Sequence, residues 1–168
     1  MRRLAAVLLL AAGVAGCGVH PEAELAQGLR VLAAPQPDAR AASVLLRRAA
    51  QAGSARGAFH LALLLRNGAD GVTVDHAQAF AWMQRAAQGG LPRAQFLLGQ
   101  MLLAGEGAAH DATQARYWFE QAAEHDLPEA NLELAMAGQR GDWGITPEET
   151  ARYMMEAQHA QKHRPPEP

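Results

Sequence analysis

The sequence is poor in the residue types on which catalytic and disulfide-stabilised proteins depend. It contains one cysteine, so no internal disulfide framework can form. Ser43 and Ser54 are its only serines, aromatic residues make up 5% of the chain, and the formal net charge is −2. A near-neutral chain has no basic field, which argues against nucleic acid as a partner. These absences leave little from which to build a nucleophilic site or a nucleic-acid interface.

The apolar run at residues 4–14 is too short to span a bilayer comfortably as a mature helix. It follows Arg2 and Arg3 and ends in small residues, which is typical of a secretory signal peptide. The next residues, Val14-Ala15-Gly16-Cys17, resemble a bacterial lipobox. That resemblance implies cleavage before Cys17 and lipidation of the cysteine. An ordinary signal peptide followed by an unrelated cysteine is the alternative.

The N-terminal pattern also predicts a location. Residues 1–16 are expected to be removed as a signal peptide, and residues 17–21 to form the lipidated cysteine and a short linker. Multiple acyl chains make membrane anchoring stable. Gly18, rather than Asp, follows the cysteine, which in Gram-negative lipoproteins implies sorting to the outer membrane. We therefore expect a protein lipid-anchored in the bacterial envelope, in the outer membrane and facing the periplasm.

The rest of the chain repeats itself at a fixed spacing. Two apolar helical patterns flank a glycine turn twice, and equivalent residues in the two copies are 36 apart. Self-similarity at such a period indicates stacked structural repeats. The clearest pairs are Asp75 with Asp111, Trp82 with Trp118, and Ala86 with Ala122.

Helix-start signals divide residues 22–160 into about four repeats and about eight antiparallel helices. The boundaries fall at about 22–54, 54–90, 91–126 and 127–160, with the first and last copies degenerate and the first lacking the glycine turn. Residues 161–168 are charged and proline-rich, which predicts a disordered tail. The predicted capping residues are Asp38, Ser54, Asp75 with Gln78, Asp111 with Gln114, and Thr146 with Glu149.

The repeated pattern resembles the Sel-one-like repeat family, which is related to tetratricopeptide repeats. The resemblance implies an all-α fold, a right-handed α/α solenoid of helical hairpins used for protein–protein interaction. It implies no catalytic machinery and no cofactor. The third repeat carries the pattern at Ala94, Leu98, Gly99, Leu102, Gly105, Gly107, Asp111, Ala115, Trp118, Phe119, Ala122 and Ala123, and the second at Leu61, Ala62, Leu65, Gly68, Gly71, Val72, Asp75, Ala79, Trp82, Ala86 and Ala87.

Most of these positions are interpreted as structural. Trp82 and Trp118 stand at helical spacing with alanines, which favours core packing over a ligand platform. Gly68, Gly71, Gly105 and Gly107 follow a helix rather than a strand, so they do not form a phosphate-binding loop. Small residues equivalent to Gly99, namely Ala62 and Ala135, are expected where the first helix of a repeat crosses the second.

The sequence leaves two other classes of function open. A hydrolase would need a nucleophile, an acid–base pair or a metal site in one pocket, and no such set stands out. His159 and His163 have the i, i+4 spacing of metal ligands, but no third ligand is near them in sequence, so surface histidines are the simpler interpretation. A structural envelope lipoprotein that contacts peptidoglycan is the other alternative.

The favoured prediction is an adaptor that binds an envelope protein or peptide through the concave face of its solenoid. In tetratricopeptide-like folds the first helix of each hairpin lines that face. An apolar floor with Arg66 and Arg140 as cationic contacts would suit an acidic partner, since aromatic, methionine and arginine residues are enriched where proteins bind. The residues placed there are Phe59, Leu63, Arg66, Asn67, Phe96, Gln100, Leu103, Leu132, Met136, Gln139 and Arg140. The alternative for Phe59 and Phe96 is that they pack between repeats.

Overall fold

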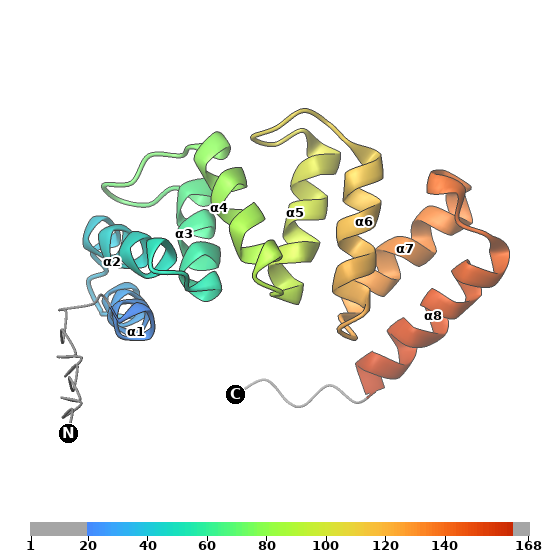
Figure 1. The fold of residues 1–168 in the computed structure, drawn as a ribbon, viewed down its shortest axis with the longest axis horizontal. Coiled ribbons are helices and arrows are strands. Elements are labelled where there is room, and N and C mark those ends of the chain that lie inside the picture. Colours follow the sequence, from blue (N-terminus) through green and yellow to red (C-terminus); the bar gives the residue numbers. More distant parts are fainter. Residues whose placement is uncertain (1–19, 163–168) are drawn as a thin grey trace, which may run out of the picture.

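The computed structural model describes residues 20–162, which form eight α-helices and one short 3₁₀ helix (Figure 1). Within these residues there is no strand, and a single isolated bridge joins Ala69 to Val72. The predicted all-α class is therefore confirmed. The helices are α1 (Pro21–Leu32), α2 (Ala39–Gln51), α3 (Ala55–Asn67), α4 (His76–Gln88), α5 (Pro92–Ala104), α6 (Ala112–Ala123), α7 (Pro128–Arg140), η1 (Asp142–Gly144) and α8 (Pro147–Lys162).

The helices begin where the sequence predicts. Asp38, Ser54, Asp75 and Asp111 each accept a hydrogen bond from a backbone N–H three residues on, which satisfies a donor that the first turn leaves unpaired. The hydrogen bonds from Gln78 hold the pKa of Asp75 below its ordinary value. The three described α-helices without a side-chain cap, α1, α5 and α7, begin with proline, whose missing N–H costs nothing at that position.

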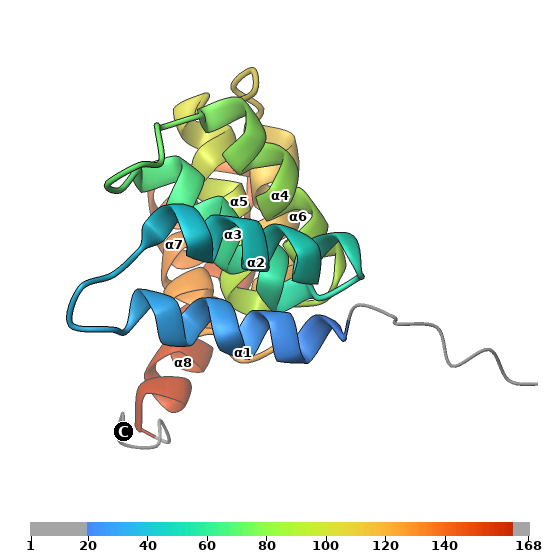
Figure 2. The ribbon, with the colours of Figure 1, turned by 90° about the vertical axis from the view of Figure 1, so that its left-hand side faces the viewer.

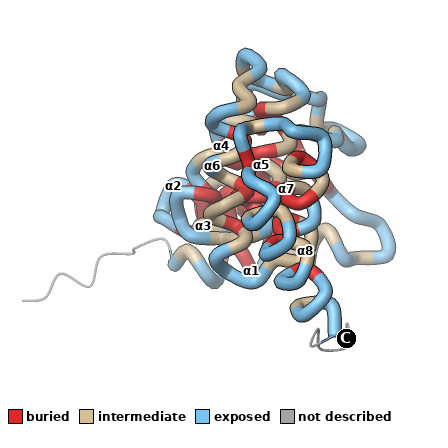
Figure 3. The backbone as a smooth tube through the Cα atoms, turned by 90° about the vertical axis from the view of Figure 1, so that its right-hand side faces the viewer, coloured by how far each residue is buried: buried red, intermediate tan, exposed pale blue. Residues whose placement is uncertain are grey.

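Consecutive helices pair as hairpins, α1 with α2 through to α7 with α8, and the hairpins stack in chain order (Figure 1). In Figure 2, α3, α5 and α7 lie on one side of the stack while α4 and α6 lie on the other. Buried positions run through the middle of the stack, and the connecting loops are exposed (Figure 3). Because one hairpin cannot bury its own apolar face, the core forms only between neighbours. The chain is thus a helical repeat solenoid.

Small residues set how closely the helices approach. A Cβ atom added at Gly99 in α5 would lie 2.8 Å from the ring of Phe119 in α6, so the predicted crossing contact is confirmed there. Trp82 is 8% exposed and its ring lies 4.5 Å from the Arg85 guanidinium, whereas Trp118 is half-buried against the core. Both tryptophans therefore pack with the core, as the spacing predicts.

Three turn residues with positive φ contact the second helix of the preceding repeat. They are Gly71, Gly107 and Trp143, which stand 36 residues apart and have φ values of 74°, 78° and 58°. A Cβ atom added at Gly107 would lie 2.1 Å from the carbonyl oxygen of His76 at the start of α4. One added at Gly71 would lie 3.4 Å from Cβ of Arg40 in α2. These turns therefore add to the helix–helix contacts between one repeat and the next.

Trp143 contacts the preceding repeat through its own side chain, where Gly71 and Gly107 do so by close approach of the backbone. Its indole stacks on Phe119 with the ring centroids 5.7 Å apart, and its carbonyl oxygen accepts a hydrogen bond from Arg116 in α6. Positive φ is rare for a bulky residue and costs conformational energy. The stacking and the hydrogen bond offset that cost. The fourth repeat therefore keeps this turn contact with the preceding repeat, which we call the docking position, without using glycine.

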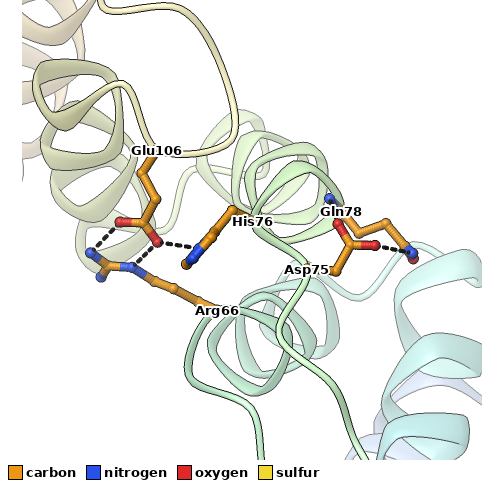
Figure 4. A network of polar contacts seen from close by, with 5 residues as sticks. All are labelled: Arg66, Asp75, His76, Gln78 and Glu106. Atoms are coloured by element: carbon orange, nitrogen blue, oxygen red, sulfur yellow. Dashed lines mark hydrogen bonds and ion pairs between the residues drawn. The ribbon is translucent and has the colours of Figure 1, made fainter.

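A polar clamp holds the turn of the third repeat against the second (Figure 4). Glu106 accepts two hydrogen bonds from Arg66 at the end of α3, at 2.8 and 2.7 Å, and its Oε1 atom lies 2.9 Å from Nδ1 of His76. The side chains of Arg66 and Glu106 are 27% and 17% exposed. The hydrogen bonds from Arg66 hold the pKa of Glu106 below its ordinary value of 4.5.

The ends of the chain bear on two predicted boundaries. Helix α8 continues through Lys162, so the tail predicted at 161–168 begins two residues too early, because the helical hydrogen bonding extends further than the proline-rich composition indicates. The signal peptide, Cys17 and the remainder of the tail lie outside the described residues.

We expect Gly107→Ala to destabilise the protein more than Gly90→Ala does. Both residues have φ of 78°, but nothing lies within 4 Å of a Cβ atom added at Gly90. Gly90→Ala should therefore report the left-handed backbone cost, about 1 kcal/mol. Gly107→Ala should add a clash worth about 1–3 kcal/mol. Urea unfolding of both variants measures the difference, and equal losses would show that the turn does not dock closely on α4.

We also expect the clamp to make stability depend on pH. Because the folded-state pKa of Glu106 is depressed, its contribution is complete above about pH 4.5 and is lost as the pH falls through that lowered pKa. At neutral pH, Glu106→Gln should cost about 1.5–3 kcal/mol, since it weakens charge-assisted hydrogen bonds to a part-buried Arg66. At about pH 3 the difference in free energy of unfolding between the variant and the wild type should become smaller.

Urea unfolding at the two pH values measures that gap. The control is Glu148→Gln, which removes an exposed carboxylate from the first turn of α8. It should leave a gap of less than about 1 kcal/mol at neutral pH. A Glu106→Gln gap that stays constant between the two pH values would contradict the clamp.

Candidate functional site

A hollow of about 440 Å³ is lined mainly by residues of α3, α5 and α7, which are the first helices of their hairpins. We call it the groove and define it by its six lining residues. Three successive repeats contribute to it, because the lining comes from α3, α5, α6 and α7. Its lining residues are Arg66, Gln100, Leu103, Ala104, Phe119 and Glu133.

The floor of the groove is apolar and firmly held. Phe119 is fully buried, and its ring packs 5.6 Å from Phe96 and 5.7 Å from Trp143. The missing side chain at Gly99 lets that ring lie directly against α5. Leu103, half-buried, extends the apolar surface toward solvent. Because Phe119 is fully buried, the apolar surface that a partner can touch is that of Leu103 and Ala104, supported by the core beneath them. A surface that is already held in place can receive an apolar group at a lower entropic cost.

The charged residues of the groove are not equivalent. The Arg66 guanidinium is already neutralised by Glu106, and the resulting hydrogen bonds raise its pKa further above the ordinary value. Glu133 is half-buried and has no ion-pair or hydrogen-bond partner among residues 20–162. The uncompensated charge that the groove presents is therefore negative.

The structure brings together some of the residues predicted to form the binding face. Arg66, Gln100 and Leu103 line one groove. Phe59, Leu63 and Met136 are half-buried, and Phe59 and Leu63 pack against the core. Four others are exposed but lie outside the lining: Asn67, Leu132, Gln139 and Arg140.

Two details of that prediction are wrong. Phe96 is 8% exposed and packs against Phe119, so it supports the floor and offers almost no surface. Arg66 and Arg140 are not free cationic contacts, since Glu106 and Asp142 pair with them, the latter at 2.7 Å. Counting helical positions assigns a residue to a face, but it does not show how deep the residue lies or which neighbour reaches it.

Sequence reasoning also missed three residues that shape the groove: Phe119, Glu133 and Glu106. Phe119 stood in the repeat pattern next to Trp118 and was grouped with the structural positions. Glu133 follows Leu132 in α7, so helical counting could have placed it near the same face. Glu106 is the central residue of the Gly-Glu-Gly turn, and an acid between two glycines was the available signal.

A second hollow, of about 540 Å³, lies between α6 and α8 and is mostly acidic. Its geometry bears on the hydrolase alternative, because carboxylates could act there as an acid–base pair. A general acid needs a raised pKa, whereas the backbone hydrogen bond from Thr146 lowers the pKa of Glu149. Its lining contains no serine, cysteine or histidine. The residues that line it are Glu120, Ala123, Glu124, Asp126, Glu149, Arg152, Tyr153 and Glu156.

Residues 20–162 contain no group of three or more His, Cys, Asp or Glu side chains placed to hold a metal ion. None of the helices in this range combines the length and the apolar character needed to cross a membrane.

Comparison with solved structures identifies the fold. A Sel1 repeat protein from Oxalobacter formigenes superposes with a TM-score of 0.77 at 24% identity, covering 84% of this chain and 59% of that one. The protective antigen c5321, present in uropathogenic Escherichia coli strains and displaying an SLR fold, gives 0.76 at 32% identity, covering 86% and 31%. Cysteine rich protein B of Helicobacter pylori gives 0.58 at 23% identity, covering 66% and 82%.

The chain thus spans 59% and 31% of the lengths of the first two proteins. No curated protein matches the sequence significantly. The family model for the Sel1 repeat matches three consecutive segments, at residues 55–91, 92–127 and 128–157, which together make up more than half of the chain. With these three matched repeats and the stacked hairpins that they form, the chain belongs to the Sel1 repeat family.

Proposed function

We propose that this protein is a non-catalytic adaptor that binds a partner protein or peptide in the groove while a lipidated Cys17 holds it in the bacterial envelope. Sel1 repeats generally mediate protein–protein interactions, and proteins of the family are typically non-catalytic scaffolds. The observation that carries the proposal is the groove itself. Three repeats contribute to one hollow with a rigid apolar floor and a polar rim.

The chemistry of the two hollows supports binding over catalysis. The groove combines a buried aromatic residue, a half-buried leucine and the amide of Gln100, which suits an extended polypeptide. The acidic hollow has no nucleophile in its lining, and its Glu149 is held in the ionised form by hydrogen bonding. We therefore do not assign a reaction to either hollow.

The proposed lipid anchor would place the adaptor close to partners in the envelope. Cys17 is the only cysteine and stands at the end of the signal pattern, so acylation there would keep the solenoid next to a membrane. Helix α1 starts at Pro21, which leaves few residues between the anchor and the first repeat. An adaptor placed in this way would meet envelope proteins, and Gly18 favours the outer membrane.

Photo-crosslinking from the groove tests the adaptor function. With benzoylphenylalanine at Gln100, whose side chain is half-buried in the groove lining, we expect a covalent adduct with one discrete protein in intact cells of the native host. The control position is Tyr117 on α6, which is 51% exposed and outside the groove. Both variants should keep the wild-type thermal melt. Adducts that are the same from both positions, or that form only from Tyr117, would rule out the groove as the binding site.

Metabolic labelling tests the anchor. Cys17→Ala should abolish incorporation of an alkyne fatty acid, because the chain has no second cysteine to accept the acyl group. Wild-type protein from the same cells is the positive control, and density fractionation of the labelled wild type shows which membrane carries it. Undiminished labelling of Cys17→Ala would exclude this site.

A further inference from the structure

The groove offers one unpaired charge beside an apolar floor, and this combination narrows the kind of partner. Resting on the function proposed above, we propose that the groove recognises a polypeptide segment in which a lysine or arginine stands next to a large apolar residue. The apolar residue would pack on Leu103 and Ala104, above the buried ring of Phe119, and the cation would pair with Glu133.

An acidic partner, which the two arginines would suggest, is disfavoured by the clamp. Glu106 already balances the charge of Arg66 through two hydrogen bonds of 2.7 and 2.8 Å, made by Nε and one terminal nitrogen. A carboxylate that bound the remaining N–H groups would lie close to Glu106, whose side chain is 17% exposed. Two negative charges at such close range repel each other, so Arg66 gives an acidic partner little net attraction.

Glu133 differs from Arg66 because no described neighbouring residue balances its charge. It is half-buried on α7 and has no ion-pair or hydrogen-bond partner among the described residues, so a cation gains an ion pair there without breaking one. Because the site adjoins apolar surface, the pair would be less screened than one in bulk water. The aliphatic stem of a lysine or arginine could lie along Leu103 while its charged end reaches the carboxylate.

Gln100 favours a polypeptide over a free cation. Its amide lines the groove and has no hydrogen-bond partner among the described residues. An amide can donate to a backbone carbonyl and accept from a backbone N–H at the same time. The groove thus offers one contact for the backbone, one for an apolar side chain and one for a cationic side chain.

The acidic hollow between α6 and α8 is not included in this proposal. It also carries carboxylates, but the only apolar residues in its lining are one buried tyrosine and one alanine. Several of its acids already have partners: Glu120 pairs with Arg116 at 2.7 Å, and Glu156 with Arg152 at 3.8 Å.

Selection from a random dodecapeptide library displayed on phage tests the proposal. The full chain, purified in detergent, would be used as wild type, as Glu133→Lys and as Glu148→Lys. Glu148 is exposed at the start of α8 and outside the groove, so its replacement makes the same change in net charge. Equal thermal melts would confirm that the three proteins are folded.

We expect wild type and Glu148→Lys to select peptides with lysine or arginine beside a large apolar residue, and Glu133→Lys to select acidic residues instead. A peptide selected by wild type should bind Glu133→Lys about tenfold more weakly in fluorescence anisotropy, and it should bind Glu148→Lys with the wild-type affinity.

Peptides without basic residues, or affinities that Glu133→Lys does not alter, would overturn the charge assignment and leave the adaptor function standing. If no peptide is selected above a blank surface, the inference fails, and crosslinking from Gln100 decides separately whether a folded protein uses the groove.

Discussion

The close approach of the 105–107 turn to the start of α4 is the constraint on which the rest of this solenoid depends. At Gly107 the backbone lies against the His76 carbonyl so closely that no side chain fits, and at the adjacent position Glu106 reaches both Arg66 and His76. Solenoid stability is approximately a sum of repeat stabilities and nearest-neighbour contacts. One turn therefore supplies both a steric and an electrostatic part of the coupling between the second and third repeats.

The same clamp determines which charge the groove presents. Arg66 lines the groove, but its pairing with Glu106 means that its charge is used within the fold. Glu133 then dominates the local field, although a count of the lining residues would give one cation and one anion. Structural and recognition roles are thus linked through a single guanidinium, and a change at Glu106 would alter both repeat coupling and the charge available to a partner.

Local signals in the sequence predicted local structure well, whereas contacts between repeats were predicted poorly. Capping aspartates such as Asp75 and crossing residues such as Gly99 act within one repeat, so their roles follow from spacing. Arg66 had an acid four residues away, Asp70, but pairs with Glu106, 40 residues on. That choice depends on how one hairpin stacks on the next, which no spacing rule supplies. The identity of the groove's unpaired charge was missed for the same reason.

The docking position also explains which repeats have glycine turns. Gly71, Gly107 and Trp143 each contact the second helix of the repeat before, through Arg40, His76 and Phe119 with Arg116 respectively. In the structure described, the α1–α2 hairpin is the first of the stack and has no earlier hairpin to contact. Its connection can therefore use Pro35, Pro37 and the capping Asp38 in place of glycine. The family model matches from residue 55 onward, and this is where the docking constraint begins to act on the sequence.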